Sequence, residues 1–239
     1  MERAWQGRLA WGVALGLLVL AFYAIRLTGP SNLEADAQDR NVGYVMDVVW
    51  QGHWLVQQDV RGRIMSKPPL HTWITAAFAE IGGINRLTLT LPSMLAVLAM
   101  ALLVLEIGRR RYGPWAGGLA ALAVVLAPMM SKHIALVRTD ALFALVVALG
   151  AFAAQRAWER GGGWAPFWFW AALATLVKGP LGLVLAAMGL LAWFWERRSD
   201  AATPRPAGTH WAGVAVFLLL TLGWLVPAIV SAGQPLVDK

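Results

Sequence analysis

The sequence predicts an all-α protein that crosses a membrane several times, and three features point to this fold class. Hydrophobic residues make up 59% of the 239 residues and charged residues only 14%, whereas about a quarter of a soluble domain is charged. Several apolar runs reach the ~20 residues that a helix needs to cross a bilayer. The 14 Trp residues fit the aromatic belts of membrane interfaces. The chain has no Cys, which excludes disulfides and thiolate metal sites.

Seven apolar segments are expected to lie in the membrane. They are, in chain order, Leu9–Thr28, Leu87–Ile107, Trp115–Met130, Asp140–Ala157, Trp164–Val177, Leu181–Trp195 and Trp211–Ala232. The first is interpreted as a retained span, because its apolar run is long for a signal peptide and no small-x-small cleavage site follows it. The fifth and sixth are short, so we expect a helical hairpin with Lys178-Gly179-Pro180 at its tip.

Basic residues predict the orientation of these segments. Arg3 and Arg8 precede the first span, and Arg109–Arg111 close the second. Lys and Arg collect in cytoplasmic loops, so the N-terminus should be inside, and the formal net charge of +7 needs no nucleic-acid partner. The polar loop 29–86 then lies outside. We expect one transmembrane domain over 1–239, from a fragment or a shortened member of its class.

The outer loop is expected to be structured. Its apolar residues recur at helical spacing over Val42–Gln51 and Leu70–Ile81, which predicts two short helices in the interface plane. Between them, Trp54–Val60 indicates an extended excursion that turns at Arg61-Gly62-Arg63. The Ser66–Pro69 segment should be stiff, because each Pro fixes its own φ and restricts the preceding residue.

Charged residues of both signs gather on the outer side of this topology. They are Asp36, Asp39, Lys67, Lys132, Arg138, Asp140 and Lys178. Ionisable groups near a membrane are costly and are usually functional or paired. A carboxylate can remove a proton from a hydroxyl or amine acceptor, and Lys or Arg can neutralise a phosphate leaving group. The pattern therefore favours transfer chemistry on a lipid-linked phosphate.

Structural explanations compete with this interpretation. Asp36 and Asp39 beside Arg40 would also fit a solvated ion pair in a loop. Asp140 would also fit an N-cap, since Asp before an apolar run is a common helix start. Lys178 would also fit a side chain that reaches out to the interface. The histidines His53, His71 and His133 lack ligand spacing with one another and are interpreted as residues of polar faces.

Several motifs in order resemble the N-terminal half of the GT-C membrane glycosyltransferases, the kind that includes the bacterial aminoarabinose transferases and the protein O-mannosyltransferases. They are Glu34-Ala35-Asp36 with Gln38-Asp39-Arg40, Gly52 with Trp54, Ser66–Leu70, Leu91-Pro92-Ser93, Gly108-Arg109-Arg110, Arg138-Thr139-Asp140 and Leu176–Pro180. The resemblance extends over nearly all of the chain and implies the GT-C fold.

The resemblance also implies an activity and residue roles. Such enzymes move a sugar from a polyprenyl-phosphate carrier to a lipid, glycan or protein acceptor, usually with inversion at the anomeric carbon. Asp36 would be the general base and Lys67 would contact the carrier phosphate. Asp140 would be the second acid. The family often has an adjacent Asp-Glu pair in the first loop, whereas the acids here are separated, so Asp39 is an alternative base.

Further expectations concern the remaining cations, the membrane and rival functions. Lys178, Arg138 and Arg40 are expected to help bind the phosphate. Metal use varies in the superfamily; the sequence has no cluster that demands a metal, and a divalent cation stays possible. The resemblance implies a bacterial inner membrane with the site facing the periplasm. The alternatives are a transporter or flippase for a lipid-linked phosphate, or a non-catalytic membrane subunit that binds it.

Overall fold

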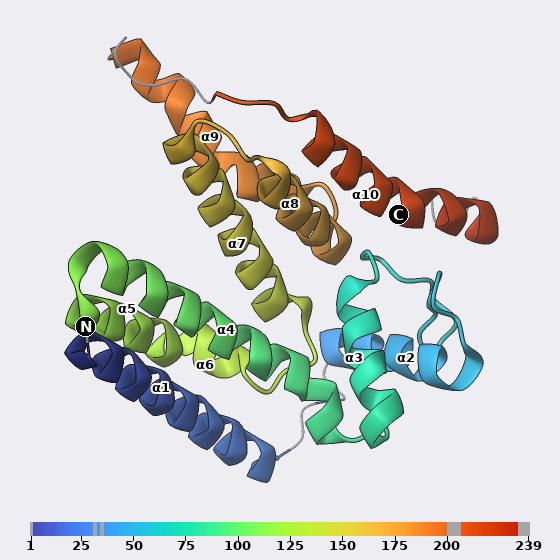
Figure 1. Ribbon diagram of the computed structural model, residues 1–239. Coiled ribbons are helices and arrows are strands. Elements are labelled where there is room, and N and C mark those ends of the chain that lie inside the picture. Colours follow the sequence, from blue (N-terminus) through green and yellow to red (C-terminus); the bar gives the residue numbers. More distant parts are fainter. Residues whose placement is uncertain (1, 31–32, 34–35, 200–206, 234–239) are drawn as a thin grey trace. The chain divides into compact units, whose positions relative to one another are not determined.

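The computed structural model describes residues 2–30, 33, 36–199 and 207–233, and this part of the chain forms ten helices (Figure 1). They are α1 (Glu2–Thr28), α2 (Asp36–Gln51), α3 (Leu70–Gly82), α4 (Arg86–Tyr112), α5 (Pro114–Leu126), α6 (Pro128–His133), α7 (Thr139–Arg160), α8 (Ala165–Lys178), α9 (Leu181–Ser199) and α10 (Trp211–Ala232). Within the described ranges no strand is found beyond an isolated antiparallel bridge between Gln58 and Ile64. The predicted all-α class is confirmed.

Each of the seven expected membrane segments contains a helix, but the helices differ in length. Four of those described are long and apolar enough to cross a bilayer: α1 from Leu9 to Thr28, α4, α7 and α10. Helix α5 and the Leu181–Leu191 part of α9 are apolar but shorter. The chain is therefore a multi-pass membrane protein, while the count of seven crossings stays a prediction.

The expected membrane segment Trp115–Met130 is not one continuous helix. Helix α5 ends at Leu126, and α6 begins at Pro128 after an extended Ala127 with φ −56° and ψ 128°. The break has a local cause, because Pro lacks the backbone N–H and disfavours helical geometry in the residue before it. The turn that follows contains Lys132 and His133.

Two compact units divide the chain. Unit 1 comprises Met1–Gln51 and His71–Leu145, and unit 2 comprises Gly52–Leu70 and Val146–Lys239. Each unit has buried apolar clusters of its own. In unit 1 the largest joins α1, α4 and α5 around Val19, and in unit 2 one joins α7, α8 and α9 around Phe167.

The two helices of the loop between α1 and α4 pack within unit 1. Val45 and Val48 of α2 are buried against Ala76 and Ala79 of α3. The buried face of α3 carries small and polar residues, whereas Ile81 on its apolar stripe is 89% exposed. Small residues at the protein interface, with the apolar stripe left outside, are the pattern of helices that pack in a membrane environment. Both predicted helices are confirmed, with α2 beginning earlier than expected.

Helices α4 and α5 approach each other at glycines, which gives a testable prediction. A Cβ at Gly117 would lie 2.6 Å from the carbonyl oxygen of Leu105 and would also meet the backbone of Arg109. Gly117→Ala should therefore lower stability by about 1–3 kcal/mol, because helix backbones cannot yield as side chains do. The control is Gly16→Ala in α1, where nothing lies within 4 Å of the added Cβ. Thermal unfolding in detergent measures the midpoint temperature of each variant. Equal midpoints for Gly117→Ala and Gly16→Ala would contradict the prediction.

Candidate functional site

One candidate group in unit 1 centres on Asp140, in the first turn of α7. The Nε of Arg138 lies 2.9 Å from Asp140 Oδ2, and His133 Nε2 lies 3.4 Å from the same oxygen. His133 Nδ1 is 2.6 Å from the carbonyl oxygen of Met129, which fixes the imidazole ring. Arg138 uses Nε for the ion pair, and its part-exposed guanidinium has two further nitrogens that are hydrogen-bond donors.

Helix α2 is attached to the segment that carries this group. Gln38 Oε1 accepts a hydrogen bond of 2.9 Å from the N–H of Val137, and Asn41 Nδ2 donates one of 2.7 Å to the Val137 carbonyl. Gln38 and Val137 are buried at 3% and 0% exposure. Gln38 and Asn41, which lie one helical turn apart, thus bind the backbone N–H and the carbonyl of the same residue, Val137. On the α4 side, Ser93 Oγ donates a 2.6 Å bond to the Leu136 carbonyl.

This attachment joins α2, which carries Asp39 of the first acidic motif, to Val137, the residue before Arg138. Asp39 and Arg40 are half-buried residues of α2, between the two amides that hold Val137. Asp36 is the first residue of α2, but its side chain lies outside the described residues, as do Glu34 and Ala35. Asp39 and Arg40 are helical, and their explanation as a solvated ion pair stays a prediction.

The structural explanation of Asp140 needs correction. Asp140 is the second residue of α7, so it acts as a first-turn acid beside a cation rather than as an N-cap. His71 and His133 are buried at 2% and 8% exposure, and His71 shares the polar buried face of α3 with Thr72 and Thr75. The contact between His133 and Asp140 was not predicted from the sequence. The two residues are close in the chain, on either side of an extended segment, and this spacing could have indicated the contact.

A small hairpin in unit 2 carries Lys67. Asp59 N donates to the Arg63 carbonyl and Met65 N donates to the Gln57 carbonyl, each at 2.9 Å. The Asp59 carboxylate accepts from the backbone N–H groups of Arg61 and Arg63 at 2.9 Å and from Arg63 Nε at 2.7 Å. The extended excursion and its turn are therefore confirmed, with Asp59 as the residue that fixes the turn.

Acid should loosen this hairpin. Burial alone would raise the pKa of the Asp59 carboxyl, but the hydrogen bonds from Arg63 and Arg61 and the Arg63 charge lower it below its ordinary value. The ionised Asp59 carboxylate therefore stabilises the folded hairpin fully above the ordinary Asp pKa of about 3.9. This stabilisation is lost as the pH falls through the lower pKa of Asp59 in the folded state. Asp59→Asn should likewise speed amide exchange at Arg61 and Arg63 by about tenfold or more at neutral pH.

Hydrogen exchange of the purified protein measures this effect. The matched control is Glu80→Gln, which removes a negative charge from an exposed position of α3. Unchanged exchange in the Asp59→Asn hairpin would mean that the turn sequence alone, and not the carboxylate, holds the loop.

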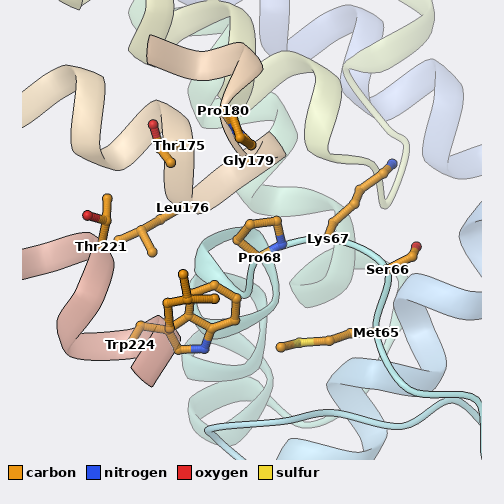
Figure 2. A pocket seen from close by; sticks show the side chains of 11 residues that line it. Met65, Ser66, Lys67, Pro68, Thr175, Leu176, Gly179, Pro180, Thr221 and Trp224 are labelled. Carbon is orange, nitrogen blue, oxygen red and sulfur yellow. The ribbon is translucent and has the colours of Figure 1, made fainter. Parts of the chain in front are cut away.

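The hairpin borders a pocket of about 250 Å³ that lies within unit 2 (Figure 2). Its lining comes from the hairpin, the α8–α9 turn and α10, with Met65, Ser66, Lys67, Pro68, Thr175, Leu176, Gly179, Pro180, Thr221, Trp224 and Leu225. Figure 2 shows the Lys67 side chain extending away from Leu176 and Trp224, so the pocket has a cationic end and an apolar end.

The apolar character of the pocket follows from its hydrogen bonds. The hydroxyls of Thr175 and Thr221 donate to the carbonyls of Ala171 and Phe217, four residues back in their own helices. Trp224 Nε1 donates to the Leu55 carbonyl at 3.1 Å. Polar groups that bond to the backbone leave methyl groups and rings to line the space, which suits a hydrocarbon chain.

The motifs Ser66–Leu70 and Leu176–Pro180, far apart in sequence, therefore line one pocket. Lys178 is the half-buried last residue of α8, directly before the lining residue Gly179. Of the candidate residues, Lys67 and Lys178 belong to unit 2, whereas Asp36, Asp39, Arg40, Arg138 and Asp140 belong to unit 1. Among the described side chains, no group of three or more His, Asp or Glu that could hold a metal ion is found.

A family model matches the chain. The family described as dolichyl-phosphate-mannose-protein mannosyltransferase matches residues 66–226, which is more than half of the 239 residues. The match includes Lys67, Arg138, Asp140 and Lys178, whereas the α2 acids precede it. No curated protein matches the chain.

Solved structures share the fold. ArnT from Cupriavidus metallidurans, in a crystal structure bound to undecaprenyl phosphate, has a TM-score of 0.78 and 22% identity, over 94% of this chain and 42% of that chain. The crystal structure of the same protein in the apo state has a TM-score of 0.76 and 23% sequence identity, over 93% of this chain and 42% of that chain. The chain thus spans less than half the length of ArnT, and its fold is of the GT-C type.

Proposed function

Because the chain belongs to the dolichyl-phosphate-mannose-protein mannosyltransferase family, we propose that it moves a sugar from a polyprenyl-phosphate carrier to an acceptor. The observation that carries the proposal is the unit 2 pocket, which has Lys67 at one end and an apolar lining at the other. A polyprenyl phosphate has the same two parts, an anionic head and a hydrocarbon chain. The similarity to ArnT, which binds undecaprenyl phosphate in one crystal structure, supports this ligand class.

The carrier phosphate would lie at Lys67. Pro68 and Pro69 restrict the backbone on one side of the lysine, and the Asp59 hairpin restricts it on the other, so little reorganisation is needed to meet the phosphate. Lys178 would add a second positive charge from the end of α8. The prenyl chain would occupy the space beside Leu176 and Trp224.

The reaction is a direct displacement at the anomeric carbon. The acceptor hydroxyl or amine forms a bond to this carbon while the bond between the carbon and the phosphate oxygen breaks. The electron pair of that bond leaves with the polyprenyl phosphate, and the acceptor proton moves to a carboxylate. Asp36 is the proposed base, with Asp39 as the alternative.

The Arg138–Asp140 pair has a supporting role in this scheme. Asp140 fixes the Nε side of the guanidinium, which leaves the opposite edge of Arg138 to contact phosphate oxygens. Arg40 would contribute charge from α2. Asp140 would then act by orienting Arg138 rather than by accepting the acceptor proton.

The proposed setting is a bacterial inner membrane with the site open to the periplasm. Arg109–Arg111 end α4 on the opposite side from the loop between α1 and α4, as expected for a cytoplasmic end. The acceptor is a lipid, glycan or protein, and the sugar is a hexose or pentose. A divalent cation is not required by the scheme.

The test compares cells with and without the gene. Mass spectrometry of envelope glycans and lipids should reveal one sugar modification that depends on the gene. Membranes that contain the protein should convert a polyprenyl-phosphate sugar into free polyprenyl phosphate and a glycosylated acceptor. Movement of intact donor across the bilayer without this conversion would instead support a transporter, and identical profiles with intact donor would contradict the proposal.

A further inference from the structure

A second cavity, of about 560 Å³, lies within unit 1, where α1 ends and α4 begins. Three cationic residues, Arg26, Arg86 and Lys132, line it, and no acidic residue is among the described lining residues. The cavity is separate from the carrier pocket, since the two share no lining residue. Its charge therefore selects for an anion.

Arg86 gives this cavity a fixed positive charge. Its Nη1 donates to the carbonyls of Leu27 and Gly29 at 2.7 and 2.6 Å, and its Nη2 donates to those of Arg26 and Pro30 at 2.6 and 3.3 Å. All four partners are carbonyl oxygens at the end of α1, where helix carbonyls lack intrahelical partners. These bonds hold the guanidinium in place without the negative charge of a carboxylate.

The other two cations are exposed and belong to separate elements. Arg26 is in the last turn of α1, and Lys132 is in α6, the turn created by Pro128. The break between α5 and α6 thus has a consequence for charge: it places a lysine beside the two arginines.

Apolar residues form the rest of the wall and point to the kind of anion. Ile25 and Leu126 are 66% and 50% exposed, and Phe22 is half-buried. Phe22 and Ile25 lie in the last turns of the α1 span, which ends at Thr28, so the cavity is expected near the boundary of the hydrocarbon region. A free phosphate would gain nothing from these side chains, whereas the acyl chains of a lipid would cover them.

We propose that this cavity binds the phosphate headgroup of an anionic membrane phospholipid, with the acyl chains along α1. The headgroup phosphate contacts Arg26 and Lys132, beside the fixed positive charge of Arg86, at the depth where spans end and lipid phosphates lie. The site is independent of the proposed transfer reaction, and its occupancy is measured by binding alone.

The test is titration of the purified protein in detergent with phosphatidylglycerol, with bound lipid counted by native mass spectrometry. Arg26→Ala and Lys132→Ala should each weaken binding about fivefold, and the double variant more, because each removes one cation near an anionic headgroup. Lys132→Arg should retain the affinity. Arg160→Ala, a matched loss of charge at the exposed end of α7, should leave it unchanged.

Two outcomes would overturn the proposal. The first is equal binding of phosphatidylglycerol by the wild type and the double variant, with thermal unfolding midpoints that show both to be folded. The second is equal binding of zwitterionic phosphatidylcholine and phosphatidylglycerol. Displacement of the lipid by inorganic phosphate at matched concentration would assign the site to free phosphate and would also reject the lipid.

Discussion

Lys67→Ala should reduce sugar transfer in membranes by about 10²- to 10³-fold, the loss expected when a fixed group that stabilises a developing charge is removed. Lys67 lies at the cationic end of the unit 2 pocket, where the carrier phosphate would take up the electron pair of the broken bond. Release of polyprenyl phosphate from the donor measures the rate. Lys67→Arg should retain part of the activity, because it keeps the charge but changes the position of the donors.

The neighbouring residue supplies the control for Lys67. Ser66→Ala changes an exposed lining residue without loss of charge and should leave the rate within a fewfold of wild type. Lys178→Ala should have a smaller effect than Lys67→Ala, since Lys178 precedes the lining residue Gly179 rather than lining the pocket. Wild-type turnover in Lys67→Ala would contradict the assignment of the phosphate site.

Asp36→Asn should reduce transfer by about 10²- to 10⁴-fold, the usual contribution of a general base. Asparagine keeps the size of the side chain but cannot take the acceptor proton. Binding of the polyprenyl-phosphate donor should be unchanged, which separates this variant from Lys67→Ala. The transfer rate is measured in single-turnover reactions, and the affinity for the donor is measured by binding to the same membranes.

The control for Asp36 is on the same helix. Asp47→Asn removes a carboxylate from the later part of α2 and should transfer at close to the wild-type rate. Loss of activity in Asp39→Asn, with a normal rate in Asp36→Asn, would move the base to Asp39. Normal rates in both variants would contradict base catalysis by the first acidic motif.

Much of the fold could be predicted from composition and periodicity. Apolar runs of about 20 residues have one stable form in a bilayer, because a helix alone satisfies its own backbone hydrogen bonds there. The helical spacing in the polar loop likewise predicted α2 and α3, and the double proline predicted a stiff corner before α3. Motif order predicted the GT-C family, which the match over residues 66–226 confirms.

The side-chain partners could not be predicted in this way, because they join residues far apart in the chain. Gln38 and Asn41 carry no local sign that they hold the backbone of Val137, about a hundred residues later. His133 was interpreted only as a residue of a polar face, and its burial beside Asp140 depends on how the chain turns at Pro128. Amides and imidazoles bond to whatever the fold brings near them.

The sequence by itself therefore determined which segments are helical and which family the chain belongs to. Only the tertiary structure decided what the charged residues meet: Lys67 shares the unit 2 pocket with the α8–α9 turn, and Arg138 and His133 contact Asp140. It also decided that Arg26, Arg86 and Lys132 share a cavity. Helix formation depends on local hydrophobicity and backbone bonding, whereas a site depends on how helices pack, which no local pattern records.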